Sequence, residues 1–270
     1  MQQEPSPPRP HDPSPEDFDS LMASKGWVQF RGVLPAAQVA VMKNDLDRLY
    51  DLCREVQTRN GVAANMEGTA HHLVGYGTSL DRMIEAFPLQ AWIDRYFAGK
   101  YILLNFGASL NPPGSRAYLA KPHRDVRAFS RDLRLSLNML VLLDSFTAQS
   151  GGTMVLSGSH ATEAMPSSEE FERSAEQIVG EPGDIVLFDS LLVHSAAPNR
   201  GEARRRALTL CLGRPWMKPQ IDFPRFIPPE RHAALSATER QLYGFDARVA
   251  VSLDEYYQPA ERWTFKADQR

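Results

Sequence analysis

Two short segments hold the residue types best suited to metal chemistry: His123-Arg124-Asp125, and the stretch that ends at His194. Residues i and i+2 of an extended segment point to the same side, so His123 and Asp125 can converge on one point. Two imidazoles and one carboxylate, with one pair in H-x-D spacing, are typical of the facial triad of non-haem Fe(II) oxygenases. Such a triad leaves open metal positions for a co-substrate and dioxygen. H-x-D also occurs in solvated polar turns, so the residues around it decide the interpretation.

Arg205 follows His194 in a segment whose two faces differ. If the segment is a strand, positions 205, 207, 209 and 211 share a small and partly polar face, and positions 206, 208, 210 and 212 share a bulky face. An arginine on the small face, beside a metal, presents a fork that fits a carboxylate. We therefore expect Arg205 to anchor a dicarboxylate co-substrate, and Arg204 and Arg206 to carry their charges in solvent.

The elements that must position these residues are expected as helices first and strands later. Capping residues and helical periodicity predict three helices, which run from Pro15 to Gly26, from Pro35 onward, and over residues 80–97. Residues 27–30 alternate and predict a short strand. The polar stretch 54–79 is predicted to be a long functional loop.

From residue 101 the pattern changes to short apolar runs separated by turn residues. These runs are at 101–110, 133–143, 153–156, 184–188 and 206–212. Such spacing is typical of a sandwich or barrel of antiparallel strands. After Trp216 the chain is rich in proline and is expected to follow the surface, with a last short helix at 236–243. The predicted class is therefore mainly β, with helices that buttress a β-core.

Length and composition indicate a globular protein with one large domain. The chain has 270 residues, of which 43% are hydrophobic and 23% charged, and its net charge is -3. This charge disfavours a general nucleic-acid binder, and no apolar run approaches the roughly 18 residues of a membrane span. Two cysteines exclude a disulfide framework. We expect a Pro-rich disordered tail at 1–14, a single domain at 15–270, no secretory signal and a cytoplasmic location.

Several sequence blocks together resemble the phytanoyl-CoA dioxygenase family of Fe(II)/2-oxoglutarate-dependent oxygenases. They are Gly26-Trp27-Val28 with the amphipathic helix after Leu34, His123-Arg124-Asp125, 137–144, Gly151-Gly152-Thr153-Met154, Ser157-Gly158-Ser159-His160, 183–194, Pro198-Asn199 and 205–208. The resemblance implies a double-stranded β-helix (jelly-roll, cupin-like) core with helices packed on one sheet. It further implies that His123, Asp125 and His194 bind Fe(II), and that Arg205 binds the C5 carboxylate of 2-oxoglutarate.

The chain departs from this family at two places. Ser195-Ala196 follows the distal histidine where Gly-Ser is frequent, so the resemblance does not extend to the serine contact with the co-substrate. Ser157 stands where a proline is usual, which is a mild structural change. Asp125 favours hydroxylation or a related oxidation, because halogenating relatives carry a small residue there to admit halide.

Three polar residues within the expected strands are candidates for contacts with 2-oxoglutarate. They are Asn105, Asn138 and Thr209. An amide inside a buried strand needs hydrogen-bond partners, so the two asparagines are equally suited to structural bonds with the backbone.

Substrate contacts are expected near the mouth of the site. Arg116 and Arg127 flank the expected mouth and favour an anionic substrate such as a carboxylate, a phosphonate or a carrier-bound acyl group. His71 and His72 lie in the predicted loop and are expected in a lid over the site, with His72 as a substrate contact.

The leading hypothesis is an enzyme that uses Fe(II), 2-oxoglutarate and dioxygen to hydroxylate, or otherwise oxidise, an unactivated C–H bond of a small molecule. Two alternatives remain open. One is a jelly-roll module that binds metal without catalysis. The other is a zinc-type hydrolase that uses the same three ligands.

Overall fold

The computed structural model describes residues 12–114 and 121–269. Residues 1–11 of the expected tail, and Arg116, lie outside the described residues. The first predicted helix is confirmed as α1 (Pro15–Ser24), which begins where Ser14 Oγ accepts a hydrogen bond from the Asp17 amide. β1 (Trp27–Phe30) follows it, as predicted.

The loop predicted at 54–79 is wrong in two respects. α2 (Ala36–Arg59) continues through the first residues of this stretch, and β2 (Thr69–His71) lies within it. The helix continues because residues 52–59 are mostly good helix formers, although few of their side chains are buried. β2 is a strand because it pairs with a longer neighbouring strand, a contact that the local sequence does not reveal.

The single helix predicted over 80–97 is two helices, α3 (Ser79–Glu85) and α4 (Gln90–Phe97). Pro88 separates them because it has no N–H to donate to a preceding turn. Leu89 adopts a left-handed backbone conformation, with φ of 59°, which turns the chain into α4.

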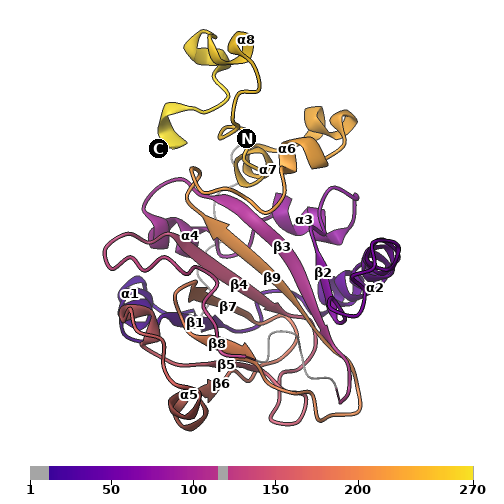
Figure 1. The fold of residues 1–270 in the computed structure, drawn as a ribbon, viewed down its shortest axis with the longest axis vertical. Helices are drawn as coiled ribbons and strands as arrows, with labels where there is room; N and C mark the ends of the chain where they lie inside the picture. The colour runs from indigo at the N-terminus through magenta and orange to yellow at the C-terminus, as the bar shows by residue number, and fades with distance from the viewer. Residues whose placement is uncertain (1–11, 115–120, 270) are drawn as a thin grey trace.

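The remaining strands form two antiparallel sheets. The larger has the order β1-β7-β4-β9-β3-β2 and the smaller β6-β5-β8 (Figure 1). The strands are β3 (Ile102–Asn111), β4 (Ser136–Leu142), β5 (Thr153–Val155), β6 (Glu176–Gln177), β7 (Ile185–Asp189), β8 (His194–Ala196) and β9 (Arg205–Gly213). This arrangement is the expected jelly-roll, with helices on the larger sheet.

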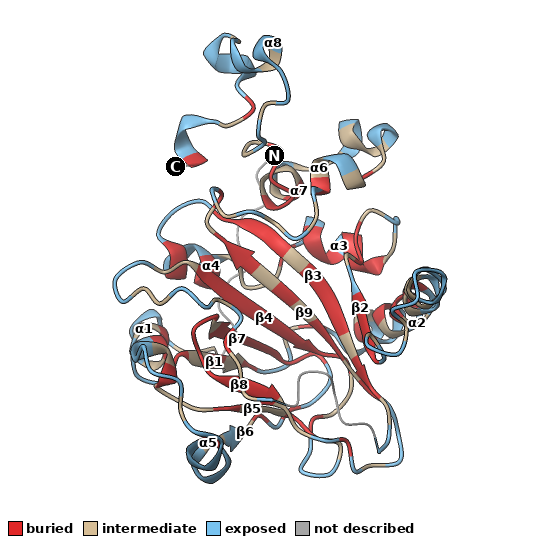
Figure 2. Ribbon diagram, in the orientation of Figure 1, coloured by how far each residue is buried: buried red, intermediate tan, exposed pale blue. Residues whose placement is uncertain are grey.

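Residues alternate along each strand between two separate cores. Met139 and Val141 of β4 belong to the core under the helices, whereas Leu140 and Leu142 belong to a smaller core between the sheets. Figure 2 shows the central strands almost entirely buried. The larger sheet therefore has two covered faces, and the face toward the smaller sheet is the one that holds the site.

After β9 the chain forms short helices outside the sheets: α6 (Phe223–Phe226), α7 (Ala237–Leu242) and α8 (Leu253–Tyr256). α7 confirms the short helix expected at 236–243. α5 (Ser168–Ser174) lies earlier, beside the smaller sheet (Figure 1). No helix in the described part of the chain is long and apolar enough to cross a membrane.

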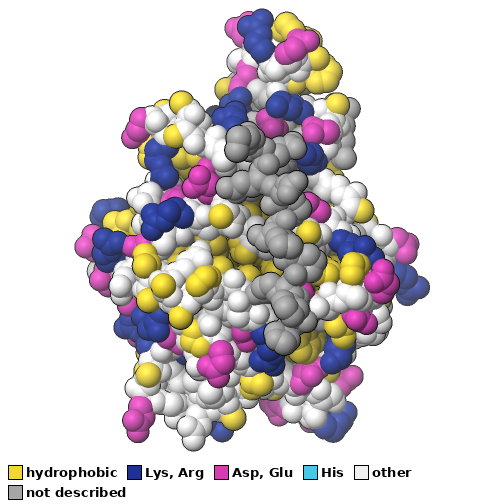
Figure 3. Space-filling view, turned by 180° about the vertical axis from the view of Figure 1, so that it is seen from behind, with side chains coloured by type: hydrophobic (Ala, Val, Ile, Leu, Met, Phe, Trp, Pro, Cys, Tyr) yellow, Lys and Arg dark blue, Asp and Glu magenta, His cyan; other side chains and the backbone are white. Residues whose placement is uncertain are grey.

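The surface carries charges of both signs. Figure 3 shows Lys and Arg side chains interspersed with Asp and Glu side chains over the described part of one face, without a large patch of one sign there. The lobe that contains α8 stands away from the sheets and exposes apolar side chains at its tip, among them Leu253 and Tyr257 (Figures 1 and 3).

Candidate active site

The structure brings together the three metal-ligating residues predicted from the sequence. One potential donor atom from each of His123, Asp125 and His194 lies within 4.8 Å of the others. His194 is in β8, and His123 pairs with it as an isolated antiparallel bridge, with both backbone N–O distances at 3.0 Å. The Asp125 amide donates to the Ser190 carbonyl oxygen at 3.1 Å. Backbone pairing thus fixes the H-x-D segment beside the distal histidine.

The hydrogen bonds of the two imidazoles leave one nitrogen of each free for a metal. His123 Nδ1 lies 2.9 Å from the Lys121 carbonyl oxygen, and His194 Nδ1 lies 3.0 Å from that of Leu192. A carbonyl only accepts, so each Nδ1 donates, and in a neutral imidazole with this tautomer the lone pair is on Nε2. Burial lowers the pKa of His194, which favours the neutral imidazole that binds metals.

Asp125 is held by an amide from the larger sheet. Asn138 Nδ2 donates to Asp125 Oδ2 at 2.7 Å. The other carboxylate oxygen, Oδ1, lies 3.7 Å from His123 Nε2. Asn138 therefore orients the carboxylate, an arrangement that outer hydrogen-bond partners of metal ligands commonly provide.

Arg124, between the two ligands of the H-x-D segment, is a site residue that the sequence analysis missed. It is buried, and its guanidinium donates to the carbonyl oxygens of Ser159, Thr162, Glu163 and Ala164. These bonds fasten the metal-ligating segment to the turn after β5. Burial lowers the pKa of Arg124. Several arginines lie near Arg124 in the sequence. The sequence alone does not distinguish an arginine that is buried and hydrogen-bonded from one that is solvated.

The triad opens into a cavity of about 400 Å³ between the sheets. Five residues of β9 line it: Leu210, and four that alternate along the strand, Arg205, Ala207, Thr209 and Cys211. This is the small face predicted from strand parity. Leu208 and Leu212, from the bulky face of β9, belong to the core under the helices.

Arg205 is buried in the cavity wall, and no described residue is its anionic partner. Only 3% of its surface is exposed, and its guanidinium carbon lies 4.4 Å from the centre of the Phe146 ring. Among the described residues nothing accepts a hydrogen bond from its Nε, and no carboxylate forms an ion pair with it. Burial lowers the pKa of Arg205 to about 10.

Arg206 contrasts with its neighbour and corrects one expectation. It was expected to carry its charge in solvent, but it is half-buried and forms ion pairs at 2.8 Å with both Asp47 and Asp144. Arg204 lies 3.7 Å from Asp47. Of the three consecutive arginines, only Arg205 lacks an acidic partner among the described residues.

The other predicted contacts have mixed positions. Asn105, Asn138 and Thr209 all line the cavity, and the Oδ1 atom of Asn105 is buried with no described partner. Arg127 is exposed and is not among the lining residues. The structure does not describe Arg116.

His71, rather than His72, lines the cavity. His72 has a positive φ of 60° and packs its ring edge-on against Phe223. In β2 the side chain of His71 extends over Gly107 of β3, where an added Cβ would lie 3.1 Å from both His71 Nδ1 and Thr209 Oγ1. A glycine at position 107 therefore keeps this part of the cavity open.

Lys218 and Gln220 also line the cavity and were not predicted. They belong to the proline-rich segment after β9, which carries no periodic signal. The backbone amide of Gln220 donates to the Leu104 carbonyl oxygen at 2.9 Å. This hydrogen bond places the segment across the end of the cavity.

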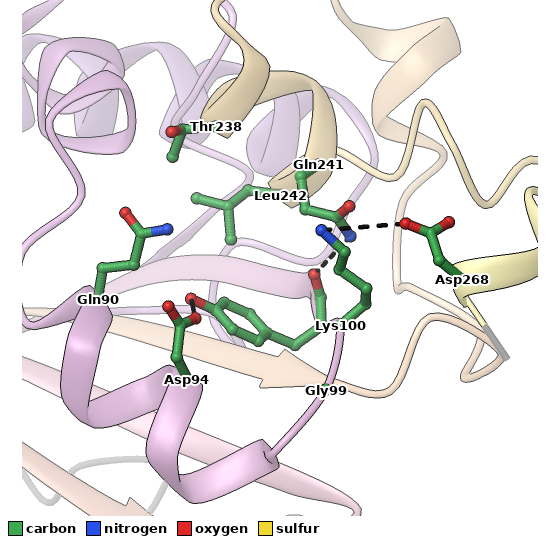
Figure 4. Close-up of a pocket in the computed structure, with 9 residues that line it drawn as sticks. Gln90, Asp94, Gly99, Lys100, Thr238, Gln241, Leu242 and Asp268 are labelled. Atoms are coloured by element: carbon green, nitrogen blue, oxygen red, sulfur yellow. Dashed lines mark hydrogen bonds and ion pairs between the residues drawn. The ribbon is translucent and has the colours of Figure 1, made fainter. Parts of the chain in front are cut away.

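A second hollow of about 480 Å³ lies between α4, α7 and the C-terminal segment (Figure 4). Its polar groups largely bond one another: Tyr101 donates to Asp94 at 2.9 Å, and Lys100 lies 4.0 Å from Asp268. No histidine or cysteine lines it. It therefore lacks the donors that distinguish the first cavity.

Comparison with known sequences identifies relatives over most of the chain. The family model described as phytanoyl-CoA dioxygenase matches residues 22–207. An uncharacterized protein of Mycobacterium tuberculosis is 28% identical over 253 residues, which cover 90% of this chain and 92% of that protein. The multifunctional dioxygenase prhA of Penicillium brasilianum is 23% identical, over 87% of this chain and 84% of its own.

Solved structures share the fold. The crystal structure of EctD from S. alaskensis, with 2-oxoglutarate and 5-hydroxyectoine, has a TM-score of 0.58 at 17% identity and covers 72% of this chain and 74% of its own. The epimerase SnoN from nogalamycin biosynthesis has a TM-score of 0.54 at 20% identity, over 76% and 83%. The family model matches more than half of the length of this chain, which therefore belongs to the phytanoyl-CoA dioxygenase family.

Proposed function

We propose that this protein is an Fe(II)- and 2-oxoglutarate-dependent dioxygenase that hydroxylates, or otherwise oxidises, an unactivated C–H bond of a small molecule. One observation carries the proposal. Arg205, a buried arginine for which the described part of the chain supplies no acidic partner, faces the same cavity as the His123–Asp125–His194 cluster. An unpaired buried charge is costly for folding, and binding of an anion compensates that cost.

The described residues fit a divalent iron ion. Two imidazoles that bond carbonyl oxygens through Nδ1, and one carboxylate, are the donor set that would hold Fe(II) at the wall of the cavity. The same donor set would bind zinc, so the ligands alone do not select the reaction. Relatives support iron, because SnoN was crystallised with Fe3+ and alpha ketoglutarate.

The described residues also fit 2-oxoglutarate. Its distal carboxylate would lie against Arg205, with Phe146 beneath the guanidinium and Ala207 leaving room above β9. Thr153, Ser195 and Thr209 line the same cavity and offer hydroxyls. The EctD structure was solved with 2-oxoglutarate, which supports this assignment for the shared fold.

Bound together, Fe(II), 2-oxoglutarate and dioxygen supply an oxidant that breaks C–H bonds, with 2-oxoglutarate converted to succinate and CO2. The chain binds and orients these components. Asn138 holds the carboxylate of Asp125, Arg124 holds the segment that carries two ligands, and Arg205 holds the co-substrate. Apolar residues such as Leu140 and Phe188 limit water in the cavity. No separate acid or base is required.

Anaerobic titration of Fe(II) and 2-oxoglutarate into metal-free protein tests the proposal. We expect the weak visible charge-transfer band of the chelate in wild type, its loss in His194→Ala and its weakening in Arg205→Ala. A wild-type protein that binds Fe(II) without this band would refute 2-oxoglutarate dependence. That result would favour the non-catalytic module or the zinc-type hydrolase.

A further inference from the structure

The part of the cavity remote from Arg205 carries a second, separate positive charge. Lys218 lines the cavity, and no described residue forms an ion pair or a side-chain hydrogen bond with it. It is exposed, so this lining residue is also accessible from solvent. Among the described residues, Arg205 and Lys218 are the only Lys or Arg residues that line the cavity, and Asp125 is the only carboxylate.

The chain holds Lys218 at this position from both sides. Before it, the Arg214 amide donates to the Leu135 carbonyl oxygen at 3.1 Å, and Met217 N donates to Arg214 O at 2.9 Å. After it, Gln220 N donates to Leu104 O at 2.9 Å. The segment therefore connects the beginnings of β4 and β3, and Lys218 lies between two anchored points.

The charges of the loaded site leave Lys218 uncompensated. Fe(II) contributes two positive charges and Asp125 one negative charge, while 2-oxoglutarate contributes two negative charges and Arg205 one positive charge. These contributions cancel, and the two ligand imidazoles are neutral. With the proposed cofactors bound, the described residues of the cavity keep a single excess positive charge, which belongs to Lys218.

The cavity that contains the metal ligands and Lys218 is apolar over part of its wall. Leu104, Val126, Phe188 and Met217 line it. Asn105 lies next to Leu104 and has a buried Oδ1 atom without a described partner. A ligand that fits this part of the cavity has an apolar body and one charged end.

We propose that the substrate is a small acid with one negative charge, whose anionic group pairs with Lys218 while its apolar body places a C–H bond near the metal. This inference rests on the proposed function, since the charge count assumes Fe(II) and 2-oxoglutarate. Lys218, which lines the cavity, thus takes the role of anion contact that the sequence analysis predicted for Arg127.

The test uses the anaerobic Fe(II)·2-oxoglutarate complex of the full chain. The probes are linear monocarboxylates from butyrate to decanoate, each compared with its primary amide at saturating 2-oxoglutarate. We expect the carboxylates to shift the visible band, and to increase succinate formation in air, at concentrations about tenfold below those of the amides. The variants are Lys218→Gln, Lys218→Arg and Arg127→Gln.

Lys218→Gln should remove the preference for the acid, Lys218→Arg should keep it, and Arg127→Gln, which changes an exposed cation outside the cavity, should leave it unchanged. Equal responses to acids and amides in wild type, no response to any acid, or a preference that survives in Lys218→Gln would overturn the inference. Absence of the band before any probe is added would refute the proposed function itself, and the inference with it.

Discussion

Replacement of Arg205 by methionine should stabilise the metal-free protein and abolish its response to 2-oxoglutarate. The guanidinium is buried at 3% exposure with no acidic partner among the described residues. Burial lowers its pKa to about 10, which corresponds to about 3 kcal/mol of unfavourable free energy for the charged form at 1.36 kcal/mol per pKa unit. Loss of the cation–π contact with Phe146 offsets about 1–2 kcal/mol of the gain.

The net expectation for Arg205→Met is a gain of about 1–2 kcal/mol, or a rise in Tm of about 2–6 °C for a domain of this size. Thermal unfolding of the metal-free protein measures it. The same scan with Mn(II), as a redox-inert substitute for iron, and 2-oxoglutarate should raise the Tm of wild type further. The variant should gain no increment from 2-oxoglutarate beyond that of Mn(II), because its site lacks the carboxylate contact.

Arg206→Met is the matched control, since it changes the adjacent residue of the same strand. Arg206 forms ion pairs with Asp47 and Asp144, and its loss leaves these carboxylates with only Arg204 and Lys43 as cationic partners among the described residues. We expect a destabilisation of about 1–3 kcal/mol and an unchanged response to 2-oxoglutarate. If Arg205→Met lowers the Tm as Arg206→Met does, and still responds to 2-oxoglutarate, the argument from an unpaired buried charge is wrong.

Three further predictions follow from contacts around the site. Asn138→Leu removes the side-chain amide that orients Asp125. Titration with Fe(II) should show an affinity about 10–100-fold lower, with an unchanged far-ultraviolet circular dichroism spectrum. An unchanged affinity would exclude the positioning role. Arg124→Ala removes the bonds to four carbonyl oxygens, and urea unfolding should show a loss of about 2–4 kcal/mol, whereas a loss below about 0.5 kcal/mol would contradict the clamp. Burial, with a smaller contribution from His71, lowers the pKa of His72 to about 4. As the pH decreases, the imidazole of His72 is therefore protonated in the unfolded chain before it is protonated in the folded protein. The free energy of unfolding should fall as the pH decreases from about 6.5 to 4. Urea unfolding across this range should show a smaller fall in His72→Gln, and an identical pH dependence in both proteins would refute the assignment.

The features that could be predicted from the sequence are those that depend on neighbouring residues along the chain. Side chains alternate with period two in a strand, so the sequence alone predicts that Arg205, Ala207, Thr209 and Cys211 of β9 lie on one face. This is the face that lines the cavity. The first residue of α1 could also be predicted from neighbouring residues, because Ser14 caps the helix and Pro15 occupies its first position. The H-x-D pair could be assigned to one site because its two residues lie on one side of an extended segment.

Tertiary structure decided which partner each polar residue has. Arg205 and Arg206 are neighbours in sequence, but Arg206 meets Asp47, from a distant helix, and Arg205 meets no acid among the described residues. Backbone pairing of β2 with β3 directs His71 into the cavity, and the positive φ of His72 turns that residue toward Phe223.

The same dependence on distant contacts explains Asn138 and Lys218. Asn138 donates to Asp125 because β4 passes beneath the H-x-D segment, and Lys218 reaches the cavity because Gln220 is hydrogen-bonded to Leu104. Strand and helix periodicity records only which face of an element is buried. The identity of the groups across that face depends on how segments far apart in the chain are packed, and only the folded structure specifies it.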